Sequence, residues 1–309
     1  MPNWCANRLY FYGEEADIAG IRNLLSGELT SHFLRAEQEG IQLFVAGCAG
    51  ILRPVEDFTY APFPALTQAG KGSNSPENIA FSRWLTSLQE EVELSKDNCH
   101  LLHRLWLNTG IGNKRWSSLS REQQGVIEKL YSDKYFDWGY TWRKGEVSEW
   151  WNRLCDNPSF FPGRPLDFLH VLPTRLDVEV NGFNGKLLEG IPSAYDWYLR
   201  RYGTKWPQGS EVNISFSCEK GIQVDFDTPW SPPDEALIAE LSRQYHCSIE
   251  HWYAEQGCDF CGYACYAEGE QLQQLQDSLE WELAEEGADV YSDIIGPEWL
   301  INNIAHFGG

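Results

Sequence analysis

Residues 211–230 limit the possible fold more than any other part of the sequence. They contain two runs in which apolar residues alternate with polar ones, separated by a Glu-Lys-Gly turn at 219–221. A period of two is typical of a strand with one buried face, and a glycine-bearing turn between two such runs predicts a β-hairpin. The alternating apolar residues are Val212, Ile214 and Phe216 before the turn and Ile222, Val224 and Phe226 after it.

The segments around this hairpin continue the same mixture of patterns. Alternation at 247–269 predicts a second hairpin, helical spacing at 231–246 predicts a helix between the two, and we also expect a strand at 165–176. The chain begins with an alternating stretch at 6–13 and then a helical pattern at 14–27 that closes on a glycine. Hairpins combined with helices indicate an α+β fold, in which helices cover one face of an antiparallel sheet.

The middle of the chain has a different character. Residues 75–155 repeat apolar side chains at helical spacing and predict a largely helical block inserted into the sheet domain. We expect the α+β domain to comprise 1–74 and 156–269, and an acidic C-terminal segment at 270–309 to pack against its body. The apolar run at 41–52 fits a buried strand or a helix, because periodicity does not distinguish the two in a short run.

The chain is strongly acidic, with a net charge of −21 from 45 Asp and Glu against 24 Lys and Arg. Binding to a phosphate backbone needs cations that displace counterions, so direct binding to nucleic acid is not expected. The same charge favours a basic partner, although it also serves solubility. No apolar run reaches the ~20 residues that span a bilayer. Since the amino terminus also lacks the pattern of a secretory signal, we expect a cytoplasmic protein without membrane contact.

Six short stretches of the sequence are distinctive. They are MPNWCANRLYFYG, LPTRL, YGTKWP, FDTPWSPP, YAEQGCDFCGYACYAEG and GPEWL. Together they resemble the YubB-like family of plasmid and prophage proteins with a ferredoxin-like domain, most specifically between Tyr202 and Gly269. The resemblance covers essentially the whole chain. It implies a ferredoxin-like βαββαβ sheet domain without an iron–sulfur cluster, an origin on mobile genetic elements, and no particular biochemical activity.

Four cysteines near the second hairpin are the candidates for a metal site. Cys258 and Cys261 form one Cys-x2-Cys pair, whereas a structural zinc site commonly uses two such pairs. Strand alternation places Cys261 and Cys265 on one face, and Cys247 or His251 on the neighbouring strand could complete a site. Because a second pair is missing, we interpret these thiols as packing residues and expect no cofactor, with zinc as the alternative.

The motif FDTPWSPP and the nearby YGTKW suggest a cleft. Trp206, Asp227, Trp230 and Glu255 would line it, and it would take a ligand or a peptide. The structural alternative has Asp227 capping a turn and Trp230 packing on the sheet. We expect Lys205 to form an ion pair with Asp227 or Glu255. No stretch matches a catalytic signature, so we assign no catalytic residue.

The C-terminal part of the chain is the most acidic. Residues 267–309 contain ten Asp and Glu and neither Lys nor Arg. We expect a helix at 271–286 and an interaction surface for a basic partner, with a solvated face as the alternative. The candidate partner-binding residues are Glu280, Glu282, Glu285, Glu286, Asp289 and Asp293.

Three hypotheses of function follow. The first is a non-enzymatic accessory protein of a mobile element, which binds a basic host or plasmid-encoded protein through an acidic, aromatic-rich surface in counter-defence or nucleic-acid mimicry. The second is a small-molecule or metal-dependent enzyme that uses the Trp206 and Trp230 cleft. The third is direct binding of single-stranded nucleic acid by tryptophans of the helical block, since aromatic rings can stack on bases.

Overall fold

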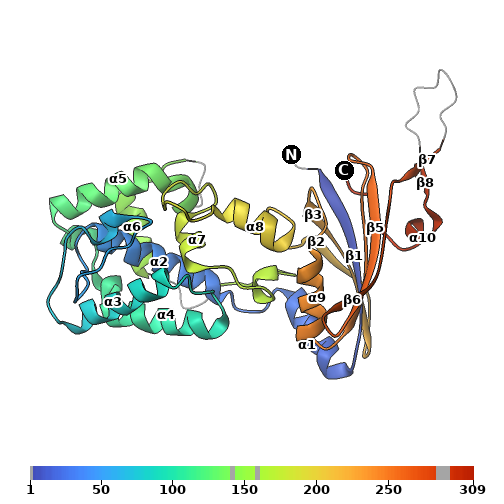
Figure 1. Ribbon diagram of the computed structural model, residues 1–309, viewed down its shortest axis with the longest axis horizontal. Coiled ribbons are helices and arrows are strands. Elements are labelled where there is room, and N and C mark those ends of the chain that lie inside the picture. The colour runs from blue at the N-terminus through green and yellow to red at the C-terminus, as the bar shows by residue number, and fades with distance from the viewer. Residues whose placement is uncertain (1–2, 140–142, 157–160, 283–292) are drawn as a thin grey trace, which may run out of the picture. The chain divides into compact units, whose positions relative to one another are not determined.

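The chain divides into two units in the computed structural model, which describes residues 3–139, 143–156, 161–282 and 293–309 (Figure 1). We name them the sheet unit and the helical unit. The sheet unit comprises Met1–Leu29, Pro162–Leu172 and Tyr198–Gly309, and the helical unit comprises Thr30–Phe161 and Pro173–Trp197.

The sheet unit is built on six antiparallel strands in the order β2-β3-β1-β4-β5-β6. Its first four strands and the two helices packed on them follow along the chain as β1, α1, β2, β3, α9 and β4, which is the βαββαβ order of a ferredoxin-like domain, and β5 and β6 extend the sheet. The fold class expected from the sequence is therefore confirmed. The bounds are β1 (Trp4–Tyr12), α1 (Glu15–Ser26), β2 (Ser210–Cys218), β3 (Gly221–Pro229), α9 (Glu235–Gln244), β4 (Ser248–Glu255), β5 (Phe260–Ala267) and β6 (Glu270–Asp277).

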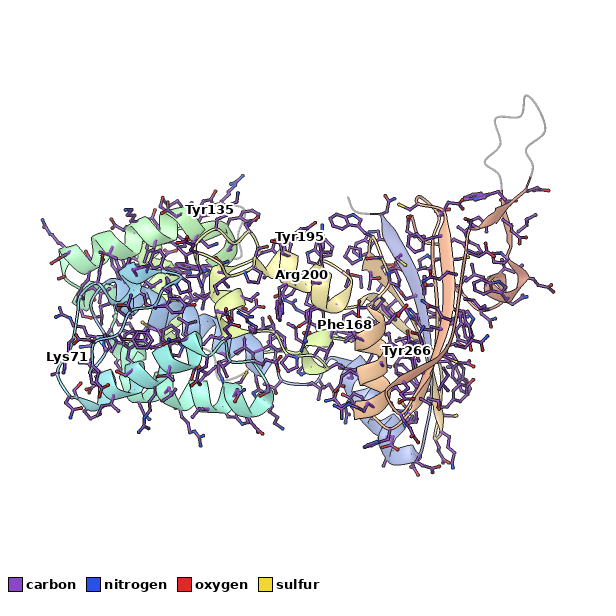
Figure 2. The ribbon with its side chains drawn as sticks, viewed as in Figure 1. Lys71, Tyr135, Phe168, Tyr195, Arg200 and Tyr266 are labelled. Carbon is purple, nitrogen blue, oxygen red and sulfur yellow. The ribbon has the colours of Figure 1, made fainter. Side chains whose placement is uncertain are left out.

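Helices α1 and α9 lie on one face of the sheet, as Figure 1 shows with the sheet nearly edge-on. Strand alternation directs Leu9 and Phe11 of β1 into this face, where both are fully buried, whereas Tyr12 on the other face is 45% exposed. Tyr266 lies on the helix-covered side of the sheet (Figure 2) and is also buried. The apolar core of the sheet unit is therefore under these two helices.

The C-terminal segment packs on the other face of the sheet. Leu279, Leu300 and Ile304 form a small apolar cluster with residues of β1, β4 and β5. Two short strands and a helix belong to this segment, namely β7 (Glu280–Trp281), β8 (Ile294–Gly296) and α10 (Glu298–Ile301). The segment covers the end of the sheet near Ala6 and Ala254.

The helix expected at 271–286 is wrong, because residues 270–277 form strand β6. The turn before it explains the difference. Glu268 and Gly269 have φ values of 53° and 83°, and two consecutive residues with positive φ make the two-residue turn that joins antiparallel strands. Every residue of β6 is exposed, so no apolar face was available to reveal the strand in the sequence.

The strand expected at 165–176 is also wrong. This segment contains the 3-10 turn η4 (Phe168–His170) and the start of helix α7 (Leu176–Asn181). The Asp167 carboxylate accepts the backbone N–H of Leu169 at 3.1 Å, which favours a tight turn over an extended chain. Phe168 then packs edge-on against Phe226 of β3, with ring centroids 6.3 Å apart.

The helical unit is larger than the block expected at 75–155. It begins at Thr30 because the apolar run at 41–52 falls largely in helix α2 (His32–Cys48), and Pro173–Trp197 also belong to it. Twelve of the 17 residues of α2 are buried, which is typical of a helix surrounded by others. The further elements are η1 (Pro64–Thr67), α3 (Pro76–Gln89), α4 (Lys96–Thr109), η2 (Ile111–Asn113), η3 (Trp116–Ser118), α5 (Arg121–Trp138) and α6 (Val147–Asp156), while α8 (Ala194–Tyr202) runs on into the sheet unit. No helix among the described segments is both long and apolar enough to cross a bilayer.

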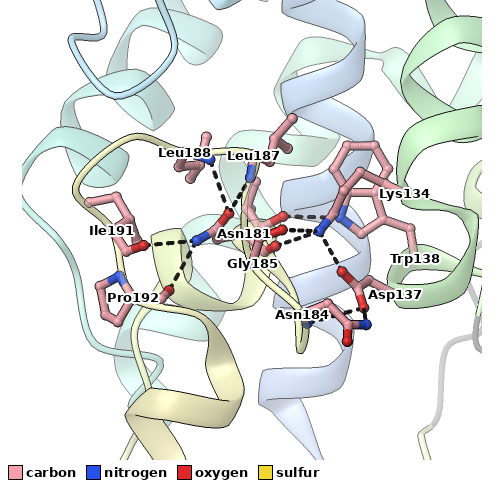
Figure 3. Close-up of polar contacts among 11 residues, drawn as sticks. Lys134, Asp137, Trp138, Asn181, Asn184, Gly185, Leu187, Leu188, Ile191 and Pro192 are labelled. Carbon is pink, nitrogen blue, oxygen red and sulfur yellow. Dashed lines mark hydrogen bonds and ion pairs between the residues drawn. The ribbon is translucent and has the colours of Figure 1, made fainter.

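A buried lysine ties the loop after α7 to α5 (Figure 3). The ammonium of Lys134 donates to the carboxylate of Asp137, to the carbonyl of Asn181 at 2.7 Å and to the carbonyl of Gly185 at 2.9 Å. These three bonds use all three N–H groups of the ammonium. The charge is therefore balanced and its donors are satisfied, as burial at 5% exposure requires.

The side chain of Asn181 continues this network into the loop (Figure 3). Its Oδ1 accepts the backbone N–H groups of Leu187 and Leu188, both at 3.0 Å. Its Nδ2 donates to the carbonyls of Ile191 and Pro192 at 3.0 and 3.1 Å. One fully buried amide thus pairs four backbone groups of a loop that has no regular secondary structure of its own.

Replacing this amide should destabilise the helical unit. We expect Asn181→Ala to lower the free energy of unfolding by roughly 3 kcal/mol, because each backbone group left unpaired in the interior costs about 1–3 kcal/mol. Chemical denaturation followed by circular dichroism measures the change. Asn108→Ala, at an exposed position of α4, is the control and should change the stability little. An equal loss in both variants would contradict the assigned role of Asn181.

Candidate functional site

Negative charge is concentrated in the sheet unit. This unit contains 25 Asp and Glu against 8 Lys and Arg, so it carries −17 of the −21 net charge. The helical unit, with 20 Asp and Glu against 16 Lys and Arg, is close to balanced. A site in the sheet unit would therefore lie in a strongly negative field.

The acidic residues expected to bind a partner are divided by the structure. Glu280 lies in β7, which pairs with β8, and the backbone N–H of Glu282 donates to the carbonyl of Asp293 at 2.8 Å. Glu280, Glu282 and Asp293 are exposed. The other three candidates lie outside the described residues, and they are Glu285, Glu286 and Asp289.

The four candidate zinc-binding cysteines are spread along the second hairpin. Cys247 precedes β4, whereas Cys258 lies in the turn after β4, so the length of an eight-residue strand, roughly 26 Å, separates them. Cys261 and Cys265 pair with Ala254 and Glu250 on one face of the sheet, at positions four residues apart. The described residues contain no group of three or more His, Cys, Asp or Glu side chains that could hold a metal ion.

Two of these thiols, Cys247 and Cys261, are also poor metal ligands in their present surroundings. Burial raises the pKa of Cys247 to about 12 and that of Cys261 to about 11. A metal binds the thiolate, so a thiol that stays protonated at neutral pH is disfavoured as a ligand. The small, buried side chains of Cys247 and Cys261 instead serve packing.

The structure brings together the two tryptophans of the expected cleft. The Nζ of Lys205 lies 4.2 Å from the ring centroid of Trp206 and 4.7 Å from that of Trp230. A cation held against two aromatic faces gains about 1 kcal/mol or more. The chain's own lysine thus occupies the position between the rings, and the ion pair expected for Lys205 with Asp227 or Glu255 is wrong.

The two acids of the expected cleft have other partners. Asp227 flanks Ala6 on one face of the sheet, and its Oδ1 lies 3.1 Å from Nε2 of His306. Burial raises the pKa of Asp227, while His306 opposes that rise. The buried carboxylate of Glu255 accepts the N–H groups of Gly257 at 2.7 Å and Cys258 at 2.6 Å, which closes the turn between β4 and β5. Strand alternation directs Glu255 to the face opposite Asp227, so the two acids do not meet.

A cleft that the sequence analysis missed lies beside the first turn of α9. We name it the α9 cleft. It has a volume of about 440 Å³, which is in the range of ligand-binding pockets. A second hollow of about 550 Å³ adjoins it and shares Pro232, Tyr253 and Gln276 with it. The α9 cleft is lined by Gly203, residues 231–236, His251 and Tyr253 of β4, Ala264 and Tyr266 of β5, and Gln274 and Gln276 of β6.

His251 is a buried histidine in the wall of the α9 cleft. Its Nε2 lies 3.0 Å from Oδ1 of Asn7, whose Nδ2 donates to the Cys5 carbonyl and to Thr228, both at 2.8 Å. Because Oδ1 of Asn7 is thus an acceptor, Nε2 of His251 carries the proton. Burial lowers the pKa of His251 to about 3, so the ring is neutral and Nδ1 is an acceptor. No described residue donates a hydrogen bond to Nδ1.

Other hydrogen-bond acceptors join His251 in the α9 cleft. Gln276 uses its Nε2 to donate to the hydroxyl of Tyr253 at 3.2 Å, and Gln274 donates its Nε2 to the carboxylate of Glu235. Each amide therefore keeps its Oε1 for accepting. The hydroxyl of Tyr266 hydrogen-bonds none of the described residues, and burial raises its pKa. The cleft is thus rich in acceptors and in aromatic surface.

One signal in the sequence points to this site. In SIEHWYAE, His251 alternates in phase with Ile249 and Tyr253, which places a titratable ring on the buried face of a strand. The pairing of β5 with β6 and the position of α9 are also needed to form the cleft. The sequence pattern favoured a helix at 271–286, and a helix there leaves no neighbouring strand beside β5.

Two family models match the sequence of the chain. One is described as "Protein of unknown function (DUF1281)" and matches residues 30–206. The other is described as "Ferredoxin-like domain in Api92-like protein" and matches residues 201–293. The second description agrees with the βαββαβ order of the sheet unit.

Similar proteins include relatives from two bacteria. Uncharacterized protein YubA of Escherichia coli K12 is 54% identical over 157 residues, which are 51% of this chain and 94% of YubA. Uncharacterized protein YubB of the same organism is 54% identical over 145 residues, which are 47% of this chain and 99% of YubB. The crystal structure of protein api92 from Yersinia pseudotuberculosis has a TM-score of 0.82 and 32% sequence identity, and the match covers 94% of this chain and 100% of that one.

His251 should make the stability of the sheet unit depend on pH. Its pKa is about 3 in the folded chain and about 6.5 in an unfolded one, so only the unfolded chain takes up this proton between those values. Its contribution is therefore fully present above about pH 6.5 and is lost as the pH falls toward 3. The variant His251→Gln retains a donor toward Asn7 but does not titrate. Relative to it, the free energy of unfolding of the wild type should fall by roughly 2 kcal/mol between pH 7 and pH 5.

Denaturation at a series of pH values measures this difference. His246→Gln removes an exposed histidine at the end of α9 and provides the matched control. If the difference in the free energy of unfolding between wild type and His251→Gln stayed constant over this pH range, the assignment of a buried, neutral imidazole to His251 would be wrong.

Proposed function

Since the chain belongs to the DUF1281 family, whose description assigns no activity, we propose a function from its own residues: the sheet unit binds a basic protein partner. The observation that carries the proposal is the concentration of −17 net charge in the sheet unit, from 25 acidic against 8 basic residues. Such a field raises the association rate of a basic partner and disfavours acidic ones.

The charge is available at the surface of the sheet unit. Exposed acidic residues lie at both ends of the β5–β6 hairpin. The nearby cation of Arg243 is paired with Glu240 of its own helix, α9. A basic partner would therefore meet carboxylates that face solvent. These exposed acids are Asp259, Glu268, Glu270, Asp277 and Glu280.

Aromatic side chains on the uncovered part of the sheet face support the same proposal. Tyr10 stacks on Tyr12 with ring centroids 4.2 Å apart, and Phe216 lies 5.9 Å from Tyr10. Tyr12 and Phe216 are 45% and 44% exposed. Glu250 pairs with Tyr10 across β1 and β4, so a carboxylate stands among the rings. Aromatic rings beside carboxylates suit a cationic polypeptide better than a phosphate backbone.

A defined basic peptide tests the proposal with the full chain. We expect a fluorescent peptide that alternates Arg with Val to bind, and the matching Glu and Val peptide not to bind, as measured by fluorescence anisotropy. Affinity for the Arg peptide should fall about tenfold between about 50 mM and about 500 mM salt, because salt screens exposed charges.

Paired charge variants locate the binding. The triple variant Glu268→Gln, Glu270→Gln and Asp277→Asn should weaken binding of the Arg peptide at least about fivefold. The triple variant Glu56→Gln, Asp57→Asn and Glu90→Gln makes the same change at exposed positions of the helical unit and should leave binding unchanged. Equal weakening by both, or equal binding of the Glu peptide, would show that the sheet unit is no selective site for a basic partner.

A further inference from the structure

We infer that the basic partner enters as an extended strand on the free edge of β6 and places a Lys or Arg side chain in the α9 cleft. The inference deepens the proposed function and rests on it. It identifies the site, the backbone conformation of the partner and the side chain that is recognised.

The outer edge of β6 is open to pairing with another strand. β6 is the last strand of the sheet, and within the described parts of the chain no strand pairs with its outer side. Edge strands are normally protected by Lys, Pro or bulges, but the sequence EQLQQLQD contains neither Lys nor Pro. Leu272 and Leu275 are 65% and 43% exposed on it. A long, exposed edge with apolar side chains is a template for another strand.

The opposite edge of the sheet is less suitable. The pairing of β2 with β3 has two register shifts, between Ser210 and Asn213 and between Ile214 and Phe216. Such irregularities disrupt the ladder and bend the strand, which protects an edge. The pairing of β5 with β6 has one shift, and from Gln273 to Asp277 its register is regular. An added strand therefore finds a regular ladder on β6.

Charge favours a basic strand over a second copy of this chain. Glu270 begins β6 and Asp277 ends it. Antiparallel pairing of two β6 strands about their centre would place Glu270 opposite Asp277, and like charges that face each other destabilise a sheet. A strand with basic residues at these positions would instead meet opposite charges.

The α9 cleft lies where a side chain of the added strand would point. Gln274 and Gln276 of β6 line the cleft, and both are on the helix-covered face, since they pair with Ala264 and Gly262 of β5. Side chains of an added strand alternate between the two faces in phase with those of β6. Those on the helix-covered face therefore lie beside the cleft, as in other cases of strand addition where pockets give specificity.

The chemistry of the cleft selects a cation. Its acceptors are Nδ1 of His251, Oε1 of Gln274 and Gln276, and the carboxylate of Glu235. A guanidinium offers five N–H donors and an ammonium three, and neither has an acceptor. The rings of Tyr253 and Tyr266 add aromatic faces for cation–π contact. An anion is disfavoured because Asp234 already caps the first turn of α9, accepting the N–H of Ala236 at 2.9 Å.

Backbone methylation of the peptide tests strand addition without changing the protein. We expect the peptide that alternates Arg with Val to bind the full chain, and the same peptide with an N-methyl group on every residue to bind at least about tenfold more weakly, because neither of its edges can then donate hydrogen bonds to the ladder. Hydrogen exchange of the amides of residues 270–277 should slow on binding of the unmodified peptide. Equal binding of the methylated peptide, or unchanged exchange, would overturn strand addition and leave the proposed function standing.

Variants of the protein test the cleft. Glu235→Gln removes an exposed charge and should weaken binding of the Arg peptide at least about fivefold. Glu219→Gln removes the same charge in the β2–β3 turn, at the opposite edge of the sheet, and should leave binding of this peptide unchanged. Equal effects of the two would overturn the cleft assignment.

Competition by agmatine distinguishes a site for a peptide from a site for any small cation. It carries a guanidinium without a peptide backbone, and we expect it to compete only weakly. If it bound as tightly as the peptide, the cleft would be a small-cation site and the inference would be wrong. If no basic peptide bound the wild type, both this inference and the proposed function would fail.

Discussion

The pairing of β1 with two strands from the far end of the chain is the constraint on which the sheet unit depends. Residues 4–12 pair with 221–229 on one side and with 248–255 on the other. Closing so long a loop costs entropy unless the intervening chain brings its own ends together. It does so here, because the N–H of Ser31 donates to the carbonyl of Phe161 at 3.3 Å. Within the sheet unit, the N–H of Leu166 donates to the carbonyl of Leu24 at 3.0 Å. The chain thus leaves and re-enters this unit at neighbouring points.

A buried polar group at the centre of that pairing connects the fold to the candidate site. Asn7 sits in β1 between β3 and β4, where an unpaired amide would cost about 1–3 kcal/mol. It is paired on both sides, with Thr228 of β3 and His251 of β4. The contact that satisfies Asn7 also decides which nitrogen of His251 carries the proton. The acceptor presented to the α9 cleft is therefore a consequence of how the central strands are joined.

The sequence predicted those elements whose local pattern agrees with their final surroundings. Ile222, Val224 and Phe226 of β3 alternate because they lie on the helix-covered face and are buried, and Gly27 ends α1 with a φ of 72° that favours glycine. The buried face expected for the other strand of this hairpin is wrong, because Ile214 and Phe216 of β2 are 43% and 44% exposed. Prediction failed where tertiary contacts, and not the local pattern, determine the secondary structure. The apolar run in α2 is buried on all sides, so it has no periodicity to distinguish helix from strand. Every residue of β6 is exposed, so this strand has no apolar periodicity either.

The candidate site also combines features that are visible in the sequence with features that only the fold brings together. The number of acidic residues can be read from the sequence. Their concentration in the sheet unit becomes apparent only with the boundaries of the two units, since the helical unit starts at Thr30. Trp206 and Trp230 were expected together and are together, yet the cation between them is the chain's own Lys205. The α9 cleft combines residues from β4, β5, β6 and α9, and no single stretch of sequence contains the pattern.

The negative charge of the sheet unit compensates for the exposed edge of β6. An unprotected edge strand usually invites pairing between copies of the same chain and then aggregation. Here each copy carries −17 in the unit that holds the edge, with Glu270 and Asp277 at its two ends, so copies repel one another over the distance at which edges would meet. In the function that we propose, the same field attracts a basic segment. One distribution of charge would thus disfavour pairing of β6 between identical chains and leave this edge available to a partner of opposite sign.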